Sequence, residues 1–538
     1  MIKKPKKTLG GPRRRRPTRA SRVGAMSPRL LSFARASPSL PGLPASVPPS
    51  RSLSRHVPAR MSASASSDAA PRAKHDVVVV GNGPVGSAVA RHIAEAGKSV
   101  LVLDGGDTLT SASDDAGRIV RPLDAEGRER WTEWNVESIA AFPSIERRSG
   151  VEFFRECGSL ACGTPAFVEK PKQRLTEANV PFVSHASGGD VERAFPFLSV
   201  PKTHVAVSDA IGGFVHPGKM IQAQNAIMTD ATGDSADTAA RSRKTCEVVR
   251  DSAVGVDERS EARSLERGAT DGGSPLAVRT KKGATYEADA VVLAGGAYTR
   301  WLASASGLLQ SPRNADVSLT SSDTCLSPKE TRRSGVGAVR NSRRTVLLAE
   351  VTEATARGAL RDMPTVKYQF APAAVTGECS PRDPAIRDDQ KRSENAHSRN
   401  EAMSVYVLPP ILYPGPDPPR GWYVKIGGGA NDFFFSENDS AAGTARVVED
   451  LDAWMRSDGD ETVADALHDV LLALMPAVNF VSLVSKPCVT TCTDDGELQC
   501  DALGAAARVF AVSGCQGKAA GPADAIGRAV AKAVVEAI

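Results

Sequence analysis

The sequence predicts an α/β fold in two parts, and three features of the chain predict it. The first is a strand–turn–helix–strand unit over residues 75–104. The second is a pair of later strand-sized apolar runs, 288–293 and 509–512, each followed by a glycine-rich turn. The third is a pair of strand candidates lying between them, 346–351 and 423–426, which predicts a second sheet. Alternating strands and helices are typical of α/β proteins.

The N-terminal unit has the order of a βαβ crossover. An apolar run at 75–80 predicts a strand, and residues 87–96 have helical character. Gly97 follows that helix where a C-terminal glycine is favoured. A second apolar run at 99–103 ends at Asp104. Two strands and one helix within about 30 residues form a βαβ unit with a right-handed connection.

The turn inside this unit predicts a dinucleotide site. Glycines at its first, third and sixth positions allow a tight turn, close approach of a pyrophosphate and close helix–strand packing. The free N–H groups of the following helix face the phosphates. Asp104 lies where a carboxylate accepts hydrogen bonds from a ribose. A structural glycine turn is the alternative, and the carboxylate does not distinguish FAD from NAD. The turn reads Gly81-Asn82-Gly83-Pro84-Val85-Gly86.

The remaining segments complete the expected organisation. Residues 212–228 predict a turn and a helix, 245–256 and 276–280 predict strands, and a helix is expected from 523 to the end. Three polar or highly charged stretches predict disordered insertions, because they lack the apolar surface that offsets the entropy of ordering. They are 257–274, 310–344 and 376–399.

Composition excludes several classes of protein. The chain has 538 residues and a net charge of +5, but residues 1–67 hold 15 Lys and Arg and no acid, which leaves −10 elsewhere. A nucleic-acid surface is therefore not expected on the body of the chain. No apolar run approaches the roughly 20 residues that span a bilayer. The nine cysteines and eight histidines are scattered, so no metal site is expected.

The N-terminal segment has the composition of an organelle transit peptide, being rich in Arg, Ser, Pro and Ala and poor in acids. The alternatives are a disordered basic tail or upstream sequence included in error, and Met26 and Met61 are other possible starts. We expect residues 1–73 to be disordered and to direct the protein to a chloroplast or a mitochondrion. Without targeting, the protein is expected in the cytoplasm, and free thiols are expected in a reducing compartment.

Five colinear segments resemble the FAD-dependent oxidoreductase family that includes monomeric sarcosine oxidase, glycine oxidase and D-amino-acid oxidase. The resemblance implies FAD as the cofactor, held by a Rossmann-type domain, and a smaller α+β substrate domain with a mostly antiparallel sheet. The segments are SASDDAGRIVR (111–121), CGSLACG (157–163), GGFVHPGKMIQAQ (212–224), YEADAVVLAGGAYTRWL (286–302) and VFAVSGCQGKAAGPADAIGR (509–528).

The resemblance also implies domain boundaries and cofactor contacts. The FAD-binding domain is expected from three segments, 74–160, 205–305 and 485–538, and the substrate domain from 161–204 and 345–484. Beyond the phosphate loop and Asp104, the expected FAD contacts are Gly105, Arg118, Val248, Gly295, Gly296, Cys488, Gly514, Cys515, Gln516, Gly517 and Lys518.

Arg118 and Arg121 are three positions apart in GRIVR. A guanidinium binds a carboxylate through two parallel hydrogen bonds and keeps its charge when buried. By resemblance, Arg118 lies beside the flavin and Arg121 binds the substrate carboxylate. Two solvated arginines in a loop or on an edge strand are the alternative.

Two further residues are assigned by resemblance. Lys425, in WYVKIGGG, corresponds to a lysine that activates oxygen, and a fixed cation there stabilises developing negative charge. Cys488, in KPCVTTCT, corresponds to a cysteine that links covalently to the flavin, with Cys492 as a competitor. The alternatives are an exposed strand lysine and a small buried thiol.

Three positions depart from sarcosine oxidase. Gly429 stands where a histidine is expected, Thr490 where a tyrosine is expected, and Gly521 where a lysine is expected, with Lys518 as a candidate replacement. These changes remove much of the aromatic and basic lining that would favour sarcosine. The pocket is therefore expected to have a different shape or to have lost activity.

The function that the resemblance implies is oxidation of the C–N bond of an amino acid or secondary amine. Hydride passes to FAD, with oxygen as acceptor, and the catalytic residues are Lys425, Arg121 and Arg118. One alternative is an FAD-dependent 2-hydroxy-acid or amine dehydrogenase with another electron acceptor. A second is a flavin-binding scaffold or assembly protein without turnover.

Overall fold

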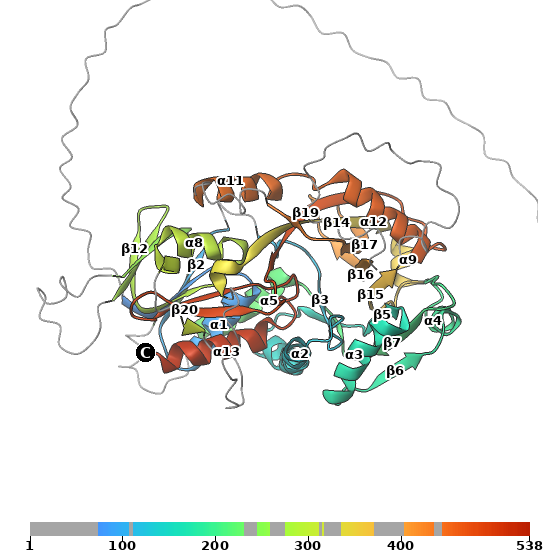
Figure 1. Cartoon of the computed structure of the whole chain (residues 1–538), viewed down its shortest axis with the longest axis horizontal. Helices are drawn as coiled ribbons and strands as arrows, with labels where there is room; N and C mark the ends of the chain where they lie inside the picture. The colour runs from blue at the N-terminus through green and yellow to red at the C-terminus, as the bar shows by residue number, and fades with distance from the viewer. Residues whose placement is uncertain are drawn as a thin grey trace, which may run out of the picture. The chain divides into compact units, whose positions relative to one another are not determined.

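The valine-rich run that opens the folded part forms the centre of the first sheet. The computed structural model describes residues 74–106, 111–230, 245–258, 275–310, 315–316, 335–370, 403–434 and 444–538 (Figure 1). The expected targeting segment 1–73, residues 259–274 and the expected insertion 376–399 lie outside them.

The first sheet is parallel at its centre. β1 pairs in parallel with β12 on one side and with β2 on the other, and β2 pairs in parallel with β9. Strands covered on both faces need continuous apolar runs, and Val77, Val78 and Val79 are fully buried. The spatial order is β13 (Ala315–Asp316), β20 (Gln499–Leu503), β21 (Val509–Ser513), β12 (Thr285–Leu293), β1 (Lys74–Val80), β2 (Val100–Asp104) and β9 (Cys246–Arg250).

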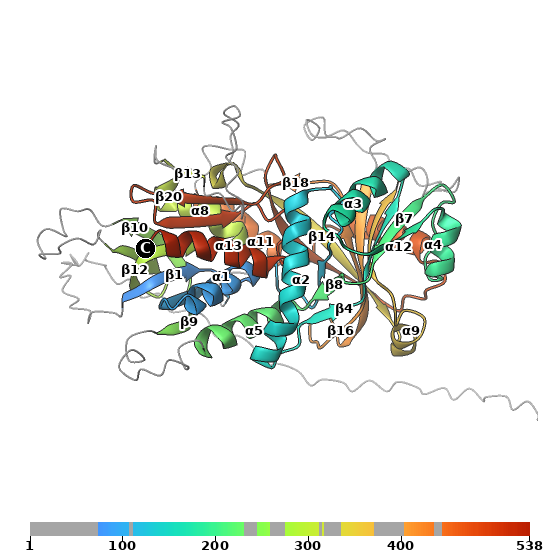
Figure 2. The same ribbon diagram turned by 90° about the horizontal axis from the view of Figure 1, so that it is seen from below.

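The first and last helices of this part pack together beside the sheet. α1 (Pro84–Glu95) contacts α13 (Ala523–Glu536), and the two lie side by side in Figure 2. A Cβ on Gly527 would lie 2.6 Å from the Cβ of Ala88, so only glycine permits this approach. The C-terminal strand and helix thus complete the unit that the N-terminal residues begin.

One predicted strand is two strands in the structure. The expected strand 245–256 is interrupted at Asp251 and Ser252. β9 continues the parallel sheet, whereas β10 (Ala253–Glu258) pairs antiparallel with β11 (Leu276–Thr280), which in turn pairs with β12. The hydrophobic pattern is continuous across the break, so the sequence does not show that the chain changes partner there.

The second sheet is antiparallel except between β15 and β5. One face carries the larger core of the second part, against which α12 (Glu461–Leu474) packs. This pattern and the first sheet confirm the predicted α/β fold. The strands are, in order, β18 (Asp432–Phe433), β14 (Arg340–Val351), β17 (Gly421–Gly428), β16 (Met403–Tyr413), β15 (Thr365–Phe370), β5 (Ser159–Gly163), β7 (Val205–Asp209) and β6 (Phe182–His185), with β19 (Leu483–Cys492) paired to β14.

Several boundaries differ from the sequence-based expectation. The expected insertion 310–344 overlaps the short helix η3 (Val336–Ala338) and the first residues of β14. β7 belongs to the second sheet, although its residues fall in the 205–305 segment expected for FAD binding. The insertion was predicted too long because the first residues of β14 are polar and do not look like a strand in the sequence. They form one by pairing with β19.

A small third sheet and a long helix lie beside the two large sheets. β8 (Gly213–Val215) pairs with both β3 (Arg118–Val120) and β4 (Phe154–Glu156). α2 runs past this small sheet in Figure 2 and contacts α13, α5 and α3. The remaining helices are α2 (Glu129–Ser149), α3 (Pro165–Glu177), α4 (Gly188–Ala194), α5 (Pro217–Asp230), η1 (Gly296–Tyr298), α8 (Thr299–Ala305), η2 (Leu308–Gln310), α9 (Glu353–Arg357) and α11 (Thr444–Met455).

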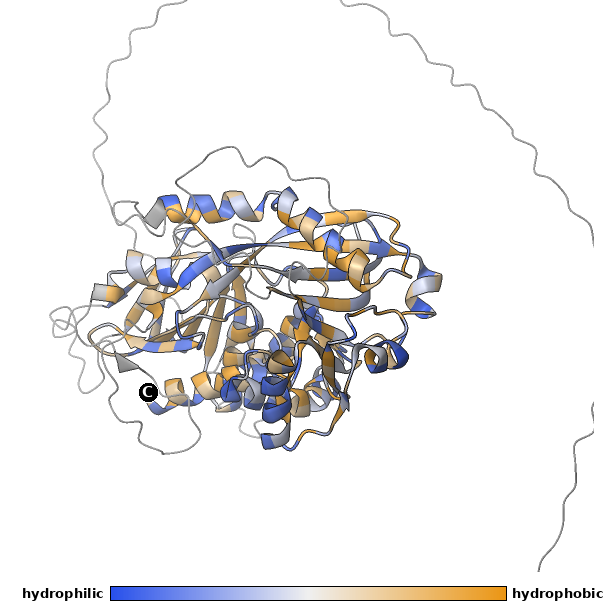
Figure 3. Ribbon diagram, turned by 45° about the vertical axis from the view of Figure 1, so that its right-hand side comes forward, coloured by the Kyte–Doolittle hydropathy of each residue, from blue (hydrophilic) through white to orange (hydrophobic). Residues whose placement is uncertain are grey.

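Hydropathy follows the layers of the fold. In Figure 3 the strands are largely orange, while the helices carry both blue and orange residues. This is the pattern of amphipathic helices that cover apolar sheets. Among the helices of the described residues, none combines the length and apolarity needed to cross a bilayer.

Candidate active site

A cavity of about 1740 Å³ is lined by residues of both large sheets. It begins at the carboxyl ends of β1, β2 and β12, where ligands of open α/β sheets bind. It continues to residues of β15, β16, β17 and β19 in the second sheet. Sites for one small ligand are usually about 300–1,000 Å³, so this cavity has room for a dinucleotide and a substrate together.

The phosphate loop has a conformation that only glycine permits at its ends. Gly81 has φ +105°, and its N–H donates to the Leu103 carbonyl at 2.9 Å. A Cβ on Gly86 would lie 2.0 Å from the Gly81 carbonyl oxygen. A Cβ on Gly83 would instead meet no atom within 4 Å. Gly81 and Gly86 thus pack tightly against neighbouring backbone, whereas Gly83 borders the open cavity. A pyrophosphate would approach the backbone at Gly83.

Asp104 stands at the end of β2 beside this loop. Its carboxylate accepts hydrogen bonds from Asn82 Nδ2 at 3.4 Å and from the Gly106 N–H at 3.0 Å. Asn82 Oδ1 is buried and has no hydrogen-bond partner among the described residues. An open glycine, an unpaired buried amide oxygen and a carboxylate at the strand end all fit a dinucleotide such as FAD.

Most residues predicted to bind FAD lie on the cavity wall, and three do not. Gly86 packs inside the loop, Val248 lies within β9, and Gly514 has φ +79° in the turn after β21. The predicted residues that line the cavity are Gly81, Asn82, Gly83, Pro84, Val85, Asp104, Gly105, Arg118, Gly295, Gly296, Cys488, Cys515, Gln516, Gly517 and Lys518.

Lys425 and Arg118 meet at a carboxylate that the sequence analysis did not assign. Lys425, on β17, is fully buried, and its ammonium donates to Asp115 and, at 3.2 Å, to the Gly117 carbonyl. Arg118 also donates to Asp115. The Tyr413 hydroxyl donates to the other oxygen of Asp115 at 2.6 Å. Three donors from three strands or their flanks thus hold one carboxylate that is 10% exposed.

The charges of this cluster shift the pKa values of its members. Burial acts to raise the pKa of Asp115, but Lys425 and Arg118 outweigh burial and hold the pKa below its usual range. Burial, together with Arg118, lowers the pKa of Lys425, and Asp115 opposes that shift. Paired charges of this kind are stable only when each keeps its partner.

Asp115 lies in the segment SASDDAGRIVR, three positions before Arg118. That spacing was the only signal that could have identified it, since Tyr413 and Lys425 come from distant strands. Tyr406 was also missed. It lies on β16 and lines the cavity, with the Lys425 ammonium 6.0 Å from its ring centre.

Arg121 lines a second charged part of the cavity. Its Nη1 atom is buried and has no hydrogen-bond partner among the described residues. Lys518 donates to Asp124 at 2.7 Å and to Glu126 at 2.6 Å, so it is held by two carboxylates. Lys367, on β15, also lines this wall and was not predicted. Arg121, Lys518, the candidate replacement for the lysine missing at position 521, and Lys367 thus line the same cavity.

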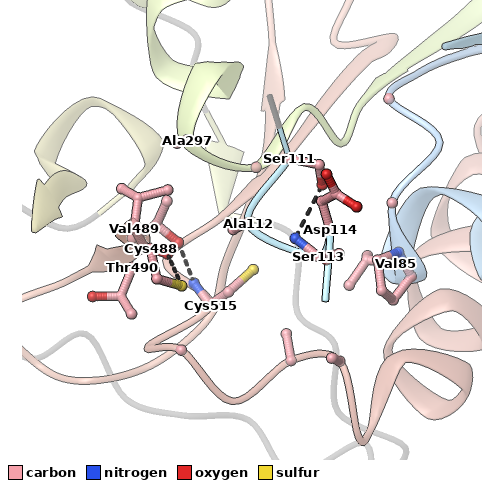
Figure 4. Close-up of a pocket in the computed structure, with 18 of the residues that line it drawn as sticks. Val85, Ser111, Ala112, Ser113, Asp114, Ala297, Cys488, Val489, Thr490 and Cys515 are labelled. Carbon is pink, nitrogen blue, oxygen red and sulfur yellow. Dashed lines mark hydrogen bonds between the residues drawn. The ribbon is translucent and has the colours of Figure 1, made fainter. Parts of the chain in front are cut away.

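Cys488 faces the cavity, whereas Cys492 does not. Figure 4 shows Cys488, Val489 and Thr490 along one strand near Cys515, with the segment from Ser111 to Asp114 nearby. Arg118 Nη2 lies 3.8 Å from the Cys488 sulfur. Cys492 is buried and lies outside the cavity lining.

The three departures from the expected pocket have different surroundings. Gly429 and Thr490 line the cavity. Arg344 donates to the Gly429 carbonyl at 2.9 Å and, through Nε, to Thr490 Oγ1 at 3.3 Å. Gly521 lies outside the lining, and a Cβ there would be 3.0 Å from the Ile119 carbonyl oxygen. Arg344 thus contacts both positions, Gly429 and Thr490, at which a histidine and a tyrosine were expected.

Comparison with known proteins agrees with this geometry. The sequence model of the family described as FAD dependent oxidoreductase matches residues 76–351, slightly more than half of the chain. N-methyl-L-tryptophan oxidase of Yersinia pestis is 24% identical over 161 residues, which are 29% of this chain and 43% of that protein. The match thus spans less than half the length of that curated relative.

Solved structures share the fold. A mutant of NikD, an amino acid oxidase of nikkomycin biosynthesis, has a TM-score of 0.56 at 18% identity, covering 86% of this chain and 94% of its own. Glycine oxidase from Geobacillus kaustophilus has a TM-score of 0.52 at 15% identity, covering 86% and 95%. At these identities the structures establish the fold alone. The family match, on a cavity with a glycine phosphate loop and a strand-end carboxylate, shows that this chain belongs to the FAD-dependent oxidoreductases.

Proposed function

We propose that this chain oxidises the C–N bond of an amino acid or a secondary amine, with oxygen as the electron acceptor. One observation carries the proposal: the buried Nη1 atom of Arg121 has no hydrogen-bond partner among the described residues, and it lies in a cavity that the phosphate loop also lines. A buried N–H group of a charged side chain that lacks a hydrogen bond is costly, so an anionic ligand is expected to accept from it. The carboxylate of an amino acid suits its geometry.

The cofactor supplies the redox step, and the protein positions the reactants. FAD, when bound, accepts the hydride from the carbon next to nitrogen. Gly81, Gly83 and the N-terminus of α1 would receive its pyrophosphate, and Asp104 would accept hydrogen bonds from its ribose. Arg121 would hold the substrate carboxylate and thereby orient the reacting carbon.

The Asp115 cluster supplies fixed charge in the same cavity. Lys425 and Arg118 carry two positive charges against the one negative charge of Asp115, so the cluster is formally cationic. Groups held in place and shielded from water stabilise negative charge more strongly than solvent does. Lys425 would act in this way on charge that develops nearby, while Asp115 holds it in one position.

A specific observation favours a second candidate, a dehydrogenase that passes electrons to another acceptor. The Lys425 ammonium is not free, because it donates to Asp115. A partner carboxylate weakens the field of the cation toward oxygen. Oxygen uptake with formation of peroxide would support the oxidase, and turnover only with an artificial acceptor would support the dehydrogenase.

An anaerobic screen tests the proposed reaction directly. The FAD-loaded protein is mixed with amino acids, N-methyl amino acids and 2-hydroxy acids, and the flavin absorbance is followed. Bleaching by an amine supports C–N oxidation, and bleaching only by hydroxy acids supports the 2-hydroxy-acid alternative. A yellow protein that no compound bleaches would point to the scaffold function.

Arg121→Met is expected to lower kcat/KM for the best substrate of this screen by about 100-fold. The reason is that hydrogen bonds to charged groups contribute about 1.5–3 kcal/mol each and the guanidinium offers two in parallel. Arg121→Lys is expected to recover only part of the loss, because an ammonium cannot form the parallel pair. The measurement is the rate of anaerobic flavin bleaching against substrate concentration, and an unchanged kcat/KM in both variants would contradict this role.

Any covalent link to the flavin is expected at Cys488 and not at Cys492, because Cys488 lines the cavity and Cys492 does not. Cys515 also lines it, but burial raises the pKa of its thiol to about 11, which disfavours the reactive thiolate. The protein is denatured and the flavin is followed with the chain. Cys488→Ala should release any flavin that the natural chain retains, whereas retention in Cys488→Ala and release in Cys492→Ala would overturn the assignment.

A further inference from the structure

The wall around Arg121 holds more positive than negative charge. Three cations line it, Arg121, Lys367 and Lys518, against two carboxylates, Asp124 and Glu126. Both carboxylates accept hydrogen bonds from Lys518. If all five groups are ionised, the wall has a formal charge of +1. In the part of the chain that the structure describes, no carboxylate is hydrogen-bonded to Arg121 or Lys367.

Strand geometry directs Lys367 toward the cavity. It lies on β15 between Val366 and Tyr368, and both of these neighbours are buried in the core on one face of the second sheet. Side chains alternate between the two faces of a strand, so Lys367 projects from the opposite face. Its cross-strand partner Tyr406 lines the same cavity. Among the described residues Lys367 forms no hydrogen bond or ion pair within 4.0 Å.

Electrostatic contacts place Lys367 next to Arg121. Burial lowers the pKa of Lys367, and Arg121 and Lys518 act in the same direction; Glu126 and Asp124 oppose them, and the pKa lies at about 8. Glu126 interacts with all three cations, and their charge outweighs its burial and holds its pKa below the usual range. Arg121 and Lys367 therefore share one carboxylate, Glu126, that is already hydrogen-bonded to Lys518.

We propose that Lys367 is a specificity-determining residue that binds a second acidic group, so that the preferred substrate is an amino acid or secondary amine with two carboxylates. This inference rests on the proposed function, since Arg121 takes the carboxylate next to the reacting carbon and Lys367 takes the other. A dicarboxylic amino acid has a net charge of −1 when its amine is protonated. This charge is equal and opposite to the formal charge of +1 on the wall. A substrate with an apolar side chain would leave Lys367 desolvated without an anion, at a cost in affinity.

Equilibrium binding of unreactive acids tests the inference without turnover. Succinate and glutarate are compared with butyrate on the FAD-loaded full chain, with calorimetry and the change in flavin absorbance as readouts. Of succinate and glutarate, the one that fits better should bind to the natural chain about 10- to 100-fold more tightly than butyrate does. This factor corresponds to one additional hydrogen bond between charged groups.

Variants assign the preference to Lys367. Lys367→Met should remove the preference for the dicarboxylate while butyrate binds as before, and Lys367→Arg should keep most of it. Lys532→Met is the matched control: it removes the same charge from an exposed position on α13, where the side chain is 70% exposed, and should keep the preference. Equal binding of dicarboxylate and butyrate by the natural chain, or an unchanged preference in Lys367→Met, would overturn the inference.

The preference should also fall as pH rises through about 8, since the pKa of Lys367 lies there and its ammonium is the binding group. The charged groups facing it are Arg121, Lys518, Glu126 and Asp124. Lys518 and the other cations hold the pKa of Glu126 below its usual range, whereas burial and Glu126 raise the pKa of Asp124, and both carboxylates accept a hydrogen bond from Lys518. A preference that persists undiminished at pH 10 would contradict this role for Lys367.

The two proposals fail in different experiments. A chain that prefers dicarboxylates but whose flavin no amine bleaches would support the acid site and overturn amine oxidation. A chain whose flavin is bleached by amino acids with apolar side chains, but which shows no dicarboxylate preference, would support the function and overturn the inference.

Discussion

Replacing Gly83 with valine is expected to weaken FAD binding by about 10- to 100-fold while leaving the fold intact. The backbone of Gly83 is extended, with φ −79° and ψ −179°, which any residue can adopt. A Cβ there meets no protein atom within 4 Å and occupies the space through which a pyrophosphate would reach the backbone. Because added methyl groups in a filled site typically cost about 1–3 kcal/mol, the affinity for FAD should fall by about 10- to 100-fold.

Gly86→Val is the matched comparison in the same loop. Its Cβ would lie 2.0 Å from the Gly81 carbonyl oxygen, so the clash exists without any ligand. We expect this variant to lose about 3 kcal/mol or more of folding stability, with loss of FAD as a consequence. Titration of the apo chains with FAD and thermal unfolding without FAD separate the two effects. Tight FAD binding by Gly83→Val would show that the phosphates lie elsewhere.

Replacing Asp115 with alanine is expected to cost about 3–5 kcal/mol of folding stability, because it leaves two buried cations without their shared partner. Lys425 is fully buried, and the Asp115 side chain is 10% exposed. Urea unfolding of the apo chain measures the loss. The double variant Asp115→Ala with Lys425→Met should recover much of it, since the uncompensated lysine is then absent.

Asp257→Ala is the control, because Asp257 pairs with Arg279 at the surface, where the two side chains are about half exposed. It should change stability little, since exposed pairs are screened by solvent. The pH dependence has a definite sign. The folded pKa of Asp115 is lowered, so its contribution is present above the unfolded pKa of about 3.9 and is lost only as pH falls through the folded value. A stable Asp115→Ala chain would mean that Lys425 and Arg118 do not depend on this carboxylate.

Local sequence was enough to predict the dinucleotide half of the site. The phosphate loop, Asp104 and the glycines after β12 depend on backbone rules that act over a few residues, such as positive φ at Gly81 and the turn from strand to helix. Arg118 and Arg121 could be predicted for a similar reason, since their spacing and their neighbours lie in one short segment. These elements have the same bounds in the structure, within a few residues.

The substrate half could not be predicted as well. Asp115 joins Lys425 and Tyr413 across about 300 positions of the chain, and no local pattern marks such a contact. Lys367 is one lysine in a short strand, and only the register between β15 and β16 places it beside Tyr406. Strand 245–256 was predicted as one because the apolar pattern does not show a change of pairing partner.

By itself, the sequence predicted the fold class and the phosphate loop from patterns within single βαβ-sized segments, and the family from five colinear segments of the chain. The tertiary structure alone decided which charges meet in the cavity. Sheet pairing brings Lys425 to Asp115 and Lys367 to Arg121 from distant segments, and burial makes the strength of each charge depend on those neighbours. The dinucleotide loop is thus encoded locally, whereas the charged wall around Arg121 and the pairing of Lys425 with Asp115 exist only once the two sheets share one cavity.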